Sequence, residues 1–586
     1  MPTSETLVAA VVATGALSSI LALEVIVGRR RLARAERAAK AARALAKKNA
    51  RSLKAANRRL KEVESGLAAG AGSSLMDRGD VLEAYALLTK ADALRAMTWE
   101  KLRGLRDALF GRGYLTAALD VATVLAELSR ASWHEDTRDA LAANIRVLTG
   151  QFWPTLRTES LAGTHPNRVL HVVKHVIVEY ENGYTIRTHN AARAQVAAGL
   201  DVQVVSLLGT DNPGAEPPST VVDGVLYRRS PGPARGSDHF DRWLQANVEY
   251  VAGIVREARP AVLHAASDFA IAMTAEAVGR AFDIPVVYES RGFWEETWLS
   301  LHAQTYGWTD IDRLEAEFGL PDAYLWRRDI ENECRRRADR VVALDDVMAD
   351  RIIAGGVLPE HLAVVPNAVD VEQFPVLTRD RALAEQLNIS PTTTVVGYIS
   401  SIVEYEGIDT LISAFARMSK TATAPVALLI VGDGPELDNL RHLAADEGLG
   451  PAEAIFTGRV PHDDVLRYYS LIDVFVVPRK PVEVCHLVTP LKPFEAFSTG
   501  RTVVLSNVRA LAGIAKQSQS AELFEAGDPV SLADVLADLI ANPERRQELA
   551  DAGTRWVRAE RTWQHNAELY VKLYRELGVV LTPAQP

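Results

Sequence analysis

Beyond Pro166 the chain alternates short apolar runs with segments of helical periodicity, and this alternation occurs in two successive sets. Apolar runs of this length, bounded by turns and separated by helical patterns, are typical of parallel strands whose two faces are covered by helices. The sequence therefore predicts an α/β protein with two doubly wound sheets. The expected strands are Val169–Val173, Val202–Leu207, Val262–Ala265, Val286–Glu289 and Val341–Leu344 in the first set, and Val395–Ile399, Ala427–Val431, Ile455–Thr457, Val474–Val477 and Thr502–Leu505 in the second.

The segment between the two sets, Val365 to Asp370, is interpreted as a hinge. The first α/β domain is then expected at residues 166–370 and the second at 380–560, and a last helix at 561–580 is expected to pack back toward the first domain. Two open sheets that face each other form a cleft at the carboxyl ends of their strands, where ligands of such folds bind. The architecture predicts a small-molecule site between the two domains.

Length and composition exclude several classes of protein. A chain of 586 residues supports roughly three or four folding units. Its 48% hydrophobic and 24% charged residues are the balance of a globular protein, and they exclude wholesale disorder and a polytopic membrane protein. The two cysteines, Cys334 and Cys485, cannot build a disulfide framework, and no cysteine and histidine cluster indicates structural zinc.

The amino terminus carries an apolar stretch that is followed by positive charge. Thr6 to Leu23 is uncharged, Glu24 interrupts it, and Arg29, Arg30 and Arg31 follow. This length crosses a bilayer marginally, and the charge distribution places the following residues in the cytoplasm. We therefore expect a membrane-anchor helix at residues 1–28, a single pass through the cytoplasmic membrane and a cytoplasmic main body. A buried or interfacial helix is the alternative.

Residues 29–66 are strongly basic and lack proline. Fourteen Lys or Arg stand against one acidic residue between positions 29 and 61, so the rest of the chain is acidic and offers nucleic acid little attraction. A seven-residue repeat that includes Leu53, Leu60 and Val63 predicts a coiled coil, with a homodimer through residues 30–67. A single helix lying on membrane lipid headgroups is the alternative. The glycines of residues 67–77 predict a flexible linker.

Residues 78–155 have helical patterns. The stretch from Ala108 to Leu128 is similar to one tetratricopeptide hairpin, with a small residue at the tight turn and alanines where the two helices meet. This module either binds a protein partner or braces the following domain.

Six motifs in the two α/β sets together resemble one family. They are Asn182-Gly-Tyr-Thr-Ile-Arg-Thr-His189, Val365-Pro-Asn-Ala-Val-Asp370, Gly397-Tyr-Ile-Ser-Ser401 with Tyr405-Glu-Gly407, Val431-Gly-Asp-Gly-Pro-Glu436, Phe456-Thr-Gly-Arg-Val-Pro461 and Thr489-Pro-Leu-Lys-Pro-Phe-Glu-Ala496. In this order and at these separations they resemble the large retaining glycosyltransferase family 4, whose fold has two Rossmann domains (the GT-B type), over residues 166–580. The resemblance implies a metal-independent enzyme without cofactors that uses a nucleoside-diphosphate sugar, which we expect to be uridine-linked.

The resemblance also implies a front-face substitution, in which the donor diphosphate assists deprotonation of the acceptor hydroxyl. No protein nucleophile is then essential, and the sequence holds neither a nucleophile elbow nor a Walker loop. Asp310 and Asp312 superficially resemble a metal-binding pair, but we interpret them as solvated residues. No metal site is predicted.

The segment Thr489-Pro490-Leu491-Lys492 precedes a predicted helix, so its backbone donors and the Lys492 charge are expected to receive the diphosphate. Stabilisation of the leaving group would make Lys492 catalytic; a solvated lysine is the alternative. Glu495 matches the later glutamate of the family's Glu-x7-Glu motif, for which the resemblance implies ribose binding.

The chain departs from the family pattern at two places. Leu487 stands where the earlier glutamate is expected near the donor sugar, and Ser400, Ser401 and Glu406 occupy the region of the family's basic pair. Ser401 and Leu487 remain candidate donor contacts. Phosphate binding would also draw on Arg479 or Lys480, unless these are ordinary surface charges.

The first α/β domain is expected to supply the other side of the site. His264 ends a predicted strand and resembles the family histidine beside the donor sugar, so it is a catalytic candidate; a satisfied core histidine is the alternative. Gly183 allows close backbone approach to the diphosphate. The candidates for the acceptor pocket are Tyr184, Thr185, Glu289 and Arg291, although Arg291 could instead pair with Glu289.

These observations predict a membrane-anchored retaining glycosyltransferase that builds a polysaccharide, a glycolipid or another cell-envelope product on a sugar, lipid-linked or polymer acceptor. A different class stays open, because Leu487 and the missing basic pair also suit a catalytically inactive scaffold or a nucleotide-sugar sensor.

Overall fold

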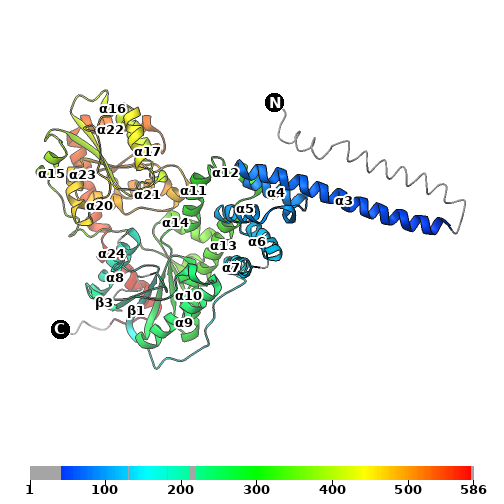
Figure 1. The fold of residues 1–586 in the computed structure, drawn as a ribbon. Helices are drawn as coiled ribbons and strands as arrows, with labels where there is room; N and C mark the ends of the chain where they lie inside the picture. The colour runs from blue at the N-terminus through cyan, green and yellow to red at the C-terminus, as the bar shows by residue number, and fades with distance from the viewer. Residues whose placement is uncertain (1–40, 130, 181, 211–218, 582–586) are drawn as a thin grey trace. The chain divides into compact units, whose positions relative to one another are not determined.

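The computed structural model describes residues 41–581 apart from 130, 181 and 211–218 (Figure 1). The chain divides into two compact units, one of residues 1–145 with 312–323, and one of residues 146–311 with 324–586. The expected anchor at residues 1–28 lies outside the described residues. None of the helices between residues 41 and 581 that the structure describes combines the length and the apolar character that crossing a bilayer requires.

The first unit is built from helices. They are α3 (Ala41–Asp77), α4 (Val81–Lys90), α5 (Trp99–Gly111), α6 (Leu115–Ser129), most of α7 (Ser132–Leu148) and α12 (Ile311–Phe318). The helices α5 and α6 form the hairpin predicted from its tetratricopeptide pattern, with Gly113 in the turn. Ala117, Ala118 and Ala122 are buried on α6. A protein partner for this unit stays a prediction.

The prediction of a flexible linker at residues 67–77 is wrong, because α3 continues without a break to Asp77. The glycine at position 72 serves close packing instead of flexibility. A Cβ added to Gly72 would lie 2.8 Å from Cγ of Leu88 in α4, so only glycine lets the two helices approach this closely. Further toward the amino terminus, Leu53 and Val63 are exposed on α3. Pairing with a second copy through this helix stays a prediction, and residues 30–40 of the expected coiled coil lie outside the described residues.

The first α/β domain is an eight-stranded sheet with the strand order β3-β4-β2-β1-β5-β6-β7-β8. Only β3 runs antiparallel to its neighbour among the described strands. The strands are β1 (His165–Val173), β2 (Asp201–Ser206), β3 (Ser219–Val222), β4 (Val225–Arg228), β5 (Pro260–Ala266), β6 (Val286–Glu289), β7 (Arg340–Ala343) and β8 (Leu362–Val364). The helices are α8 (Gly183–Ala197), α9 (Phe240–Ala258), α10 (Phe269–Phe282), α11 (Trp294–Tyr306), α13 (Asp322–Arg337) and α14 (Asp346–Ala354).

The second α/β domain is a six-stranded parallel sheet with the order β11-β10-β9-β12-β13-β14. Its strands are β9 (Thr394–Ile399), β10 (Val426–Val431), β11 (Ala454–Phe456), β12 (Val474–Val477), β13 (Thr502–Ser506) and β14 (Ala521–Phe524). Its helices are α15 (Arg381–Gln386), α16 (Ile408–Ser419), α17 (Leu437–Asp446), α18 (Val465–Leu471), α19 (Glu483–Leu487), α20 (Lys492–Ser498), α21 (Arg509–Ser518), α22 (Pro529–Ala541) and α23 (Pro543–Glu560).

Both sheets confirm the predicted doubly wound architecture. The strands β9, β12 and β13 are buried along their whole length, as expected for parallel strands covered on two faces. The chain crosses between the two domains twice. The segment Val365–Asp370 is the first crossing, and the second is at Arg561, whose carbonyl accepts a hydrogen bond from the Val369 amide over 2.9 Å. Beyond it, α24 (Trp563–Glu576) packs against α8 of the first domain.

Candidate functional site

Loops from the two α/β domains meet at the carboxyl ends of their strands. A Cβ added to Gly183, the first residue of α8, would lie 3.9 Å from the Cδ1 atom of Leu491. A Cβ added to Gly292, just before α11, would lie 3.9 Å from the Cγ2 atom of Val488. The segment Val488 to Leu491 of the second domain therefore faces the loops that precede α8 and α11. The structure thus brings together the predicted residues Gly183 and Leu491.

Lys492 and Glu495 lie together at the start of α20. Their side chains form an ion pair with 3.2 Å between Nζ and Oε2, and the Tyr469 hydroxyl donates to the same oxygen over 2.7 Å. Tyr469 is fully buried, so it fixes the carboxylate, whereas the Lys492 side chain is 33% exposed. The two predicted residues therefore form one unit, in which the buried Tyr469 fixes the carboxylate and the ammonium group is accessible.

Glu289, at the carboxyl end of β6, is the centre of a buried polar network. Arg187 and Arg291 donate to its Oε1 atom over 2.8 and 2.9 Å, and Tyr570 of α24 donates to Oε2 over 2.8 Å. Burial alone would raise the pKa of Glu289, but Arg291 and Arg187 hold the pKa of this carboxyl well below its ordinary value. Glu289 is therefore a charged group, and the pairing of Arg291 with Glu289 that the sequence left open is confirmed.

The same network extends to the segment that faces Gly183. Arg187 donates to the carbonyls of Val365 and Pro366 over 3.1 Å each and to Oδ1 of Asn367 over 2.8 Å. Asn367 in turn donates from Nδ2 to the carbonyl of Thr489 over 2.8 Å. A continuous chain of hydrogen bonds therefore runs from Glu289 through the first crossing segment to the loop that precedes Lys492.

Sequence analysis missed Arg187 and Asn367 as members of this site. Both stand inside quoted motifs, but no local pattern shows that they contact each other, because they are 180 positions apart. Their burial, at 3% and 4% exposed, and their contacts identify them as residues that hold the two domains in register.

His264 lies inside this network and is fully buried. Its Nε2 atom is 2.8 Å from Oε2 of Glu289, and its Nδ1 atom is 2.7 Å from the Tyr574 hydroxyl of α24. The ring of His171 stacks on it with 4.5 Å between ring centroids. Burial lowers the pKa of His264, and the Glu289 contact offsets this only in part. The geometry matches the satisfied core histidine that the sequence left open, and a direct role of His264 toward a sugar stays a prediction.

Arg479 makes its contacts with protein groups behind the segment Val488 to Leu491. Its Nη2 atom is 2.7 Å from Oε1 of Glu406, and Nη1 donates to the Val488 carbonyl over 2.9 Å. Burial lowers the pKa of Arg479, but Glu406 more than offsets it, so the net shift is upward. Arg479 is thus a buried, paired group instead of an ordinary surface charge, and it positions the backbone of Val488. A contact between Arg479 and a phosphate stays a prediction.

The loop after β9 lies against this arginine because of a glycine. Gly407 has a positive φ of 70°, and an added Cβ would lie 2.0 Å from the Pro478 carbonyl oxygen. The close approach brings Glu406 to Arg479. Lys480, the next residue, pairs with Glu404 over 3.3 Å and with Asp409 over 2.9 Å. Glu406, which stands in the region of the family's basic pair, therefore has a structural partner in this chain, Arg479.

The remaining predicted residues lie in different surroundings. The Tyr184 hydroxyl donates to the Ala266 carbonyl over 2.8 Å, and the buried Thr185 hydroxyl donates to the Tyr180 carbonyl over 2.7 Å as part of the amino-terminal cap of α8. Leu487 is 1% exposed, so its side chain belongs to the core. Ser401 is exposed just beyond β9.

Two neighbouring carboxyls are buried, Glu295 of α11 and Glu331 of α13. Glu295 is 1% exposed, and Glu331 accepts from the Tyr288 hydroxyl over 2.5 Å, with Arg335 nearby. Burial, reinforced by Glu331, raises the pKa of Glu295 to about 7, although Arg335 opposes the shift.

This shift predicts a pH-dependent contribution to stability. Because the folded state binds the Glu295 proton more tightly than the unfolded state, the contribution is complete below the unfolded pKa of about 4.3 and is lost as the pH rises to about 7. In urea denaturation of wild type and Glu295→Gln, we expect the difference in unfolding free energy to move in favour of the variant by about 3 kcal/mol between pH 4 and pH 8. A difference that does not change with pH would contradict this protonation.

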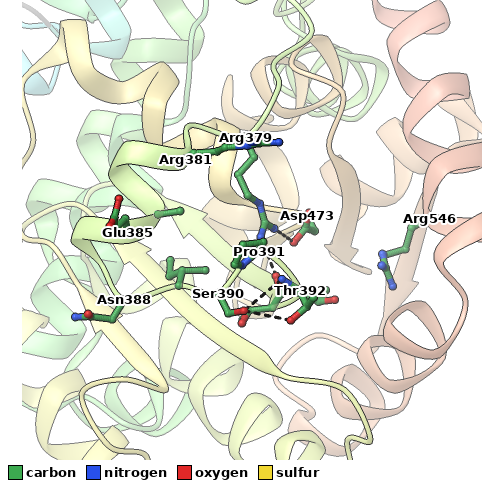
Figure 2. A pocket seen from close by; sticks show the side chains of 13 residues that line it. Arg379, Arg381, Glu385, Asn388, Ser390, Pro391, Thr392, Asp473 and Arg546 are labelled. Carbon is green, nitrogen blue, oxygen red and sulfur yellow. Dashed lines mark hydrogen bonds and ion pairs between the residues drawn. The ribbon is translucent and has the colours of Figure 1, made fainter.

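A cavity of about 920 Å³ lies at the amino ends of strands of the second sheet (Figure 2). Thr394, which begins β9, and Asp473, which precedes β12, line it. Arg379 pairs with Asp473 over 2.5 Å, and Arg546 donates to the Ile540 carbonyl over 3.0 Å. The cavity therefore stands at the amino ends of the strands, away from all of the motif loops.

Comparison with known proteins agrees with the fold and the motif loops. Residues 380–556 match the family model described as glycosyl transferases group 1. Residues 182–368 match a second model, described as a glycosyl transferase 4-like domain.

Curated relatives include two kinds of enzyme. A GDP-mannose-dependent alpha-(1-6)-phosphatidylinositol monomannoside mannosyltransferase of Mycobacterium tuberculosis is 29% identical over 209 residues, which are 34% of this chain and 52% of the relative. The chain thus matches about half the length of that relative. A D-inositol 3-phosphate glycosyltransferase of Catenulispora acidiphila is 27% identical over 407 residues, which are 67% of this chain and 90% of the relative.

Solved structures share the fold at low identity. The sucrose-phosphate synthase of Thermosynechococcus elongatus matches 70% of this chain and 99% of its own with a TM-score of 0.56 and 18% identity. Anabaena HepE, solved in complex with UDP, matches 70% of this chain and all of its own with a TM-score of 0.52 and 14% identity. These structures show the shared fold alone. The family matches assign residues 380–556 to the glycosyl transferases group 1 and residues 182–368 to the glycosyl transferase 4-like domains.

Proposed function

We propose that this protein transfers a sugar from a nucleoside diphosphate to a sugar, lipid-linked or polymer acceptor. The observation that carries the proposal is the accessible ammonium group of Lys492, held over Glu495 where the loops of the two domains meet. Departure of a nucleoside diphosphate develops negative charge, and a positioned cation stabilises that charge more in the transition state than in the ground state.

Some residues of the site are proposed to bind the donor, and others position the residues that bind it. Glu495 is proposed to accept hydrogen bonds from the ribose hydroxyls through Oε1, because both of its protein contacts described above use Oε2. Arg479 and Asn367 hold the carbonyls of Val488 and Thr489, so they orient the backbone that approaches the diphosphate. Retention of the anomeric configuration, through front-face attack without a metal ion, is part of the proposal.

The relatives suggest where a search for the donor should begin. Two of them are named for GDP-mannose or inositol phosphate, whereas the sequence motifs predict a uridine-linked donor. We place GDP-mannose first and UDP-glucose second. A role at the cytoplasmic membrane face is proposed from the amino-terminal sequence and the phospholipid acceptor that the mycobacterial relative's name gives.

Transfer is tested with the purified full chain, both donors and two acceptors, phosphatidylinositol monomannoside and inositol 3-phosphate. We expect release of nucleoside diphosphate that depends on the acceptor, an axial linkage in the product by NMR, and activity that persists in EDTA. Saturable nucleotide binding without any turnover would instead identify the protein as a nucleotide-sugar sensor. A folded protein that binds neither GDP nor UDP would contradict the proposal and favour the alternative of a catalytically inactive scaffold.

A further inference from the structure

Helix α11 carries a row of aromatic side chains. Trp294, Trp298, His302 and Tyr306 follow one another at four-residue spacing, and Trp308 comes just after the helix. The ring centroids of Trp298 and His302 are 3.7 Å apart, and those of Tyr306 and Trp308 are 5.5 Å apart. Four residues advance a helix by about 6 Å, and the ring centroids of His302 and Tyr306 are 5.9 Å apart, so the row follows the length of the helix.

One part of this row is open to solvent. The opposite side of α11 faces the core, where Glu295 and Glu296 are 1% and 5% exposed. Trp294 is 37% exposed and Leu301 is 39% exposed, and both lie on the same helix face as Trp298. We name Trp294, Trp298 and Leu301 the α11 platform. Apolar side chains that gather on one exposed helix face suit a binding surface.

The α11 platform is continuous with the candidate site. The helix begins two residues after Gly292, which faces Val488, and near its other end Gln304 donates to Oε1 of Glu436 over 2.6 Å. Glu436 ends the Val431 to Glu436 motif of the second domain. Helix α11 therefore contacts the domain that carries Lys492 both through α19 and through Glu436, so the platform stands on a helix that borders the site.

We propose that the α11 platform binds the sugar units of a saccharide acceptor behind the unit that is glycosylated. This inference rests on the proposed function and names its acceptor as an oligosaccharide or a longer glycan. Aromatic rings suit sugars because their flat apolar faces stack on the C–H face of a pyranose, while nearby polar groups such as Gln304 meet the hydroxyls.

Charge favours a saccharide over a membrane surface. From Trp294 to Asp310 the chain has no lysine or arginine, and two of its three acidic residues, Glu295 and Glu296, are buried. Helices that lie on anionic membranes combine aromatic residues with a face rich in lysine and arginine. Lys174 approaches the platform, with its Nζ atom 5.9 Å from the Trp294 ring centroid. The platform thus suits a neutral or weakly acidic glycan.

The test measures binding of saccharides of two lengths to the full chain by calorimetry. The probes are α-mannan, α-glucan, β-glucan and galactan oligosaccharides of about two and about six units. We expect at least one six-unit probe to bind at least tenfold more tightly than its two-unit counterpart. Trp298→Ala and Leu301→Asn should each lower the ratio of six-unit to two-unit affinity at least fivefold. Trp99→Ala, at a 49% exposed tryptophan of the first unit, should leave this ratio unchanged.

Three results would overturn the inference: no binding of any probe, affinity independent of length, or unchanged affinity in both platform variants. A titration with GDP and UDP separates this failure from that of the proposed function, because nucleotide binding should remain equal in wild type and platform variants. Loss of cosedimentation with phosphatidylcholine and phosphatidylglycerol vesicles in the platform variants, without saccharide binding, would assign the surface to lipid. Thermal unfolding confirms that each variant is folded.

Discussion

Replacing Glu289 by glutamine should lower the unfolding free energy by about 3 to 5 kcal/mol. The substitution keeps the shape of the side chain but leaves the guanidinium groups of Arg187 and Arg291 in the interior without their carboxylate. The Glu289 side chain is 1% exposed and the Arg187 side chain is 3% exposed, so water cannot reach the guanidinium groups to solvate their unpaired charge. The loss should be measured by urea denaturation at pH 7.

A matched control is available on the surface of the same unit. Glu159 pairs with Arg256, and both side chains are more than two-fifths exposed, so Glu159→Gln should leave stability close to wild type. Equal stabilities of wild type and Glu289→Gln would mean that the buried network is not a charged one. Glu289→Gln should also weaken nucleotide binding, because Arg187 and Asn367 transmit its position to Thr489.

Replacing Lys492 by alanine should lower turnover at least tenfold, which corresponds to about 1.4 kcal/mol of transition-state stabilisation. The lysine is the accessible cation at the loop that faces Gly183, whereas Arg479 and Lys480 are held by Glu406, Glu404 and Asp409. Steady-state rates with a saturating donor measure the effect. Lys492→Arg keeps the charge and should retain more activity than Lys492→Ala.

The control for this experiment is Lys420→Ala, at an exposed lysine after α16. It should match wild type in turnover and in stability. If Lys492→Ala turns over as fast as Lys420→Ala, Lys492 has no role in the chemistry. A rise in KM with unchanged turnover would assign it to binding alone.

The sequence was most informative where strands are buried on both faces. Val286–Glu289 and Val474–Val477 have the bounds predicted from their apolar runs, because a covered parallel strand is a continuous apolar run. The strand Ser219–Val222 was missed because it lies at the edge of the sheet and alternates with exposed residues. Gly72 was misinterpreted because a sequence does not show whether a glycine gives flexibility or room for a neighbour.

The candidate site was predictable only where its residues are close in sequence. Lys492 and Glu495 are three positions apart, so helical spacing alone brings them together. The partners of Arg479 and Glu289 come from distant segments, Glu406 and Tyr570, and their pairing depends on how loops and α24 pack. Sequence reasoning could therefore offer alternatives for these charges, and only the fold decides between them.

The most direct test of the central claim is a crystal structure of the full chain with GDP or UDP bound. We predict the diphosphate beside Thr489 to Lys492, with the Lys492 ammonium group on a phosphate oxygen and the Glu495 carboxylate on the ribose. Nucleotide density in another place, such as the cavity beside Arg379, or side chains of Lys492 and Glu495 that turn away from the nucleotide, would contradict the account.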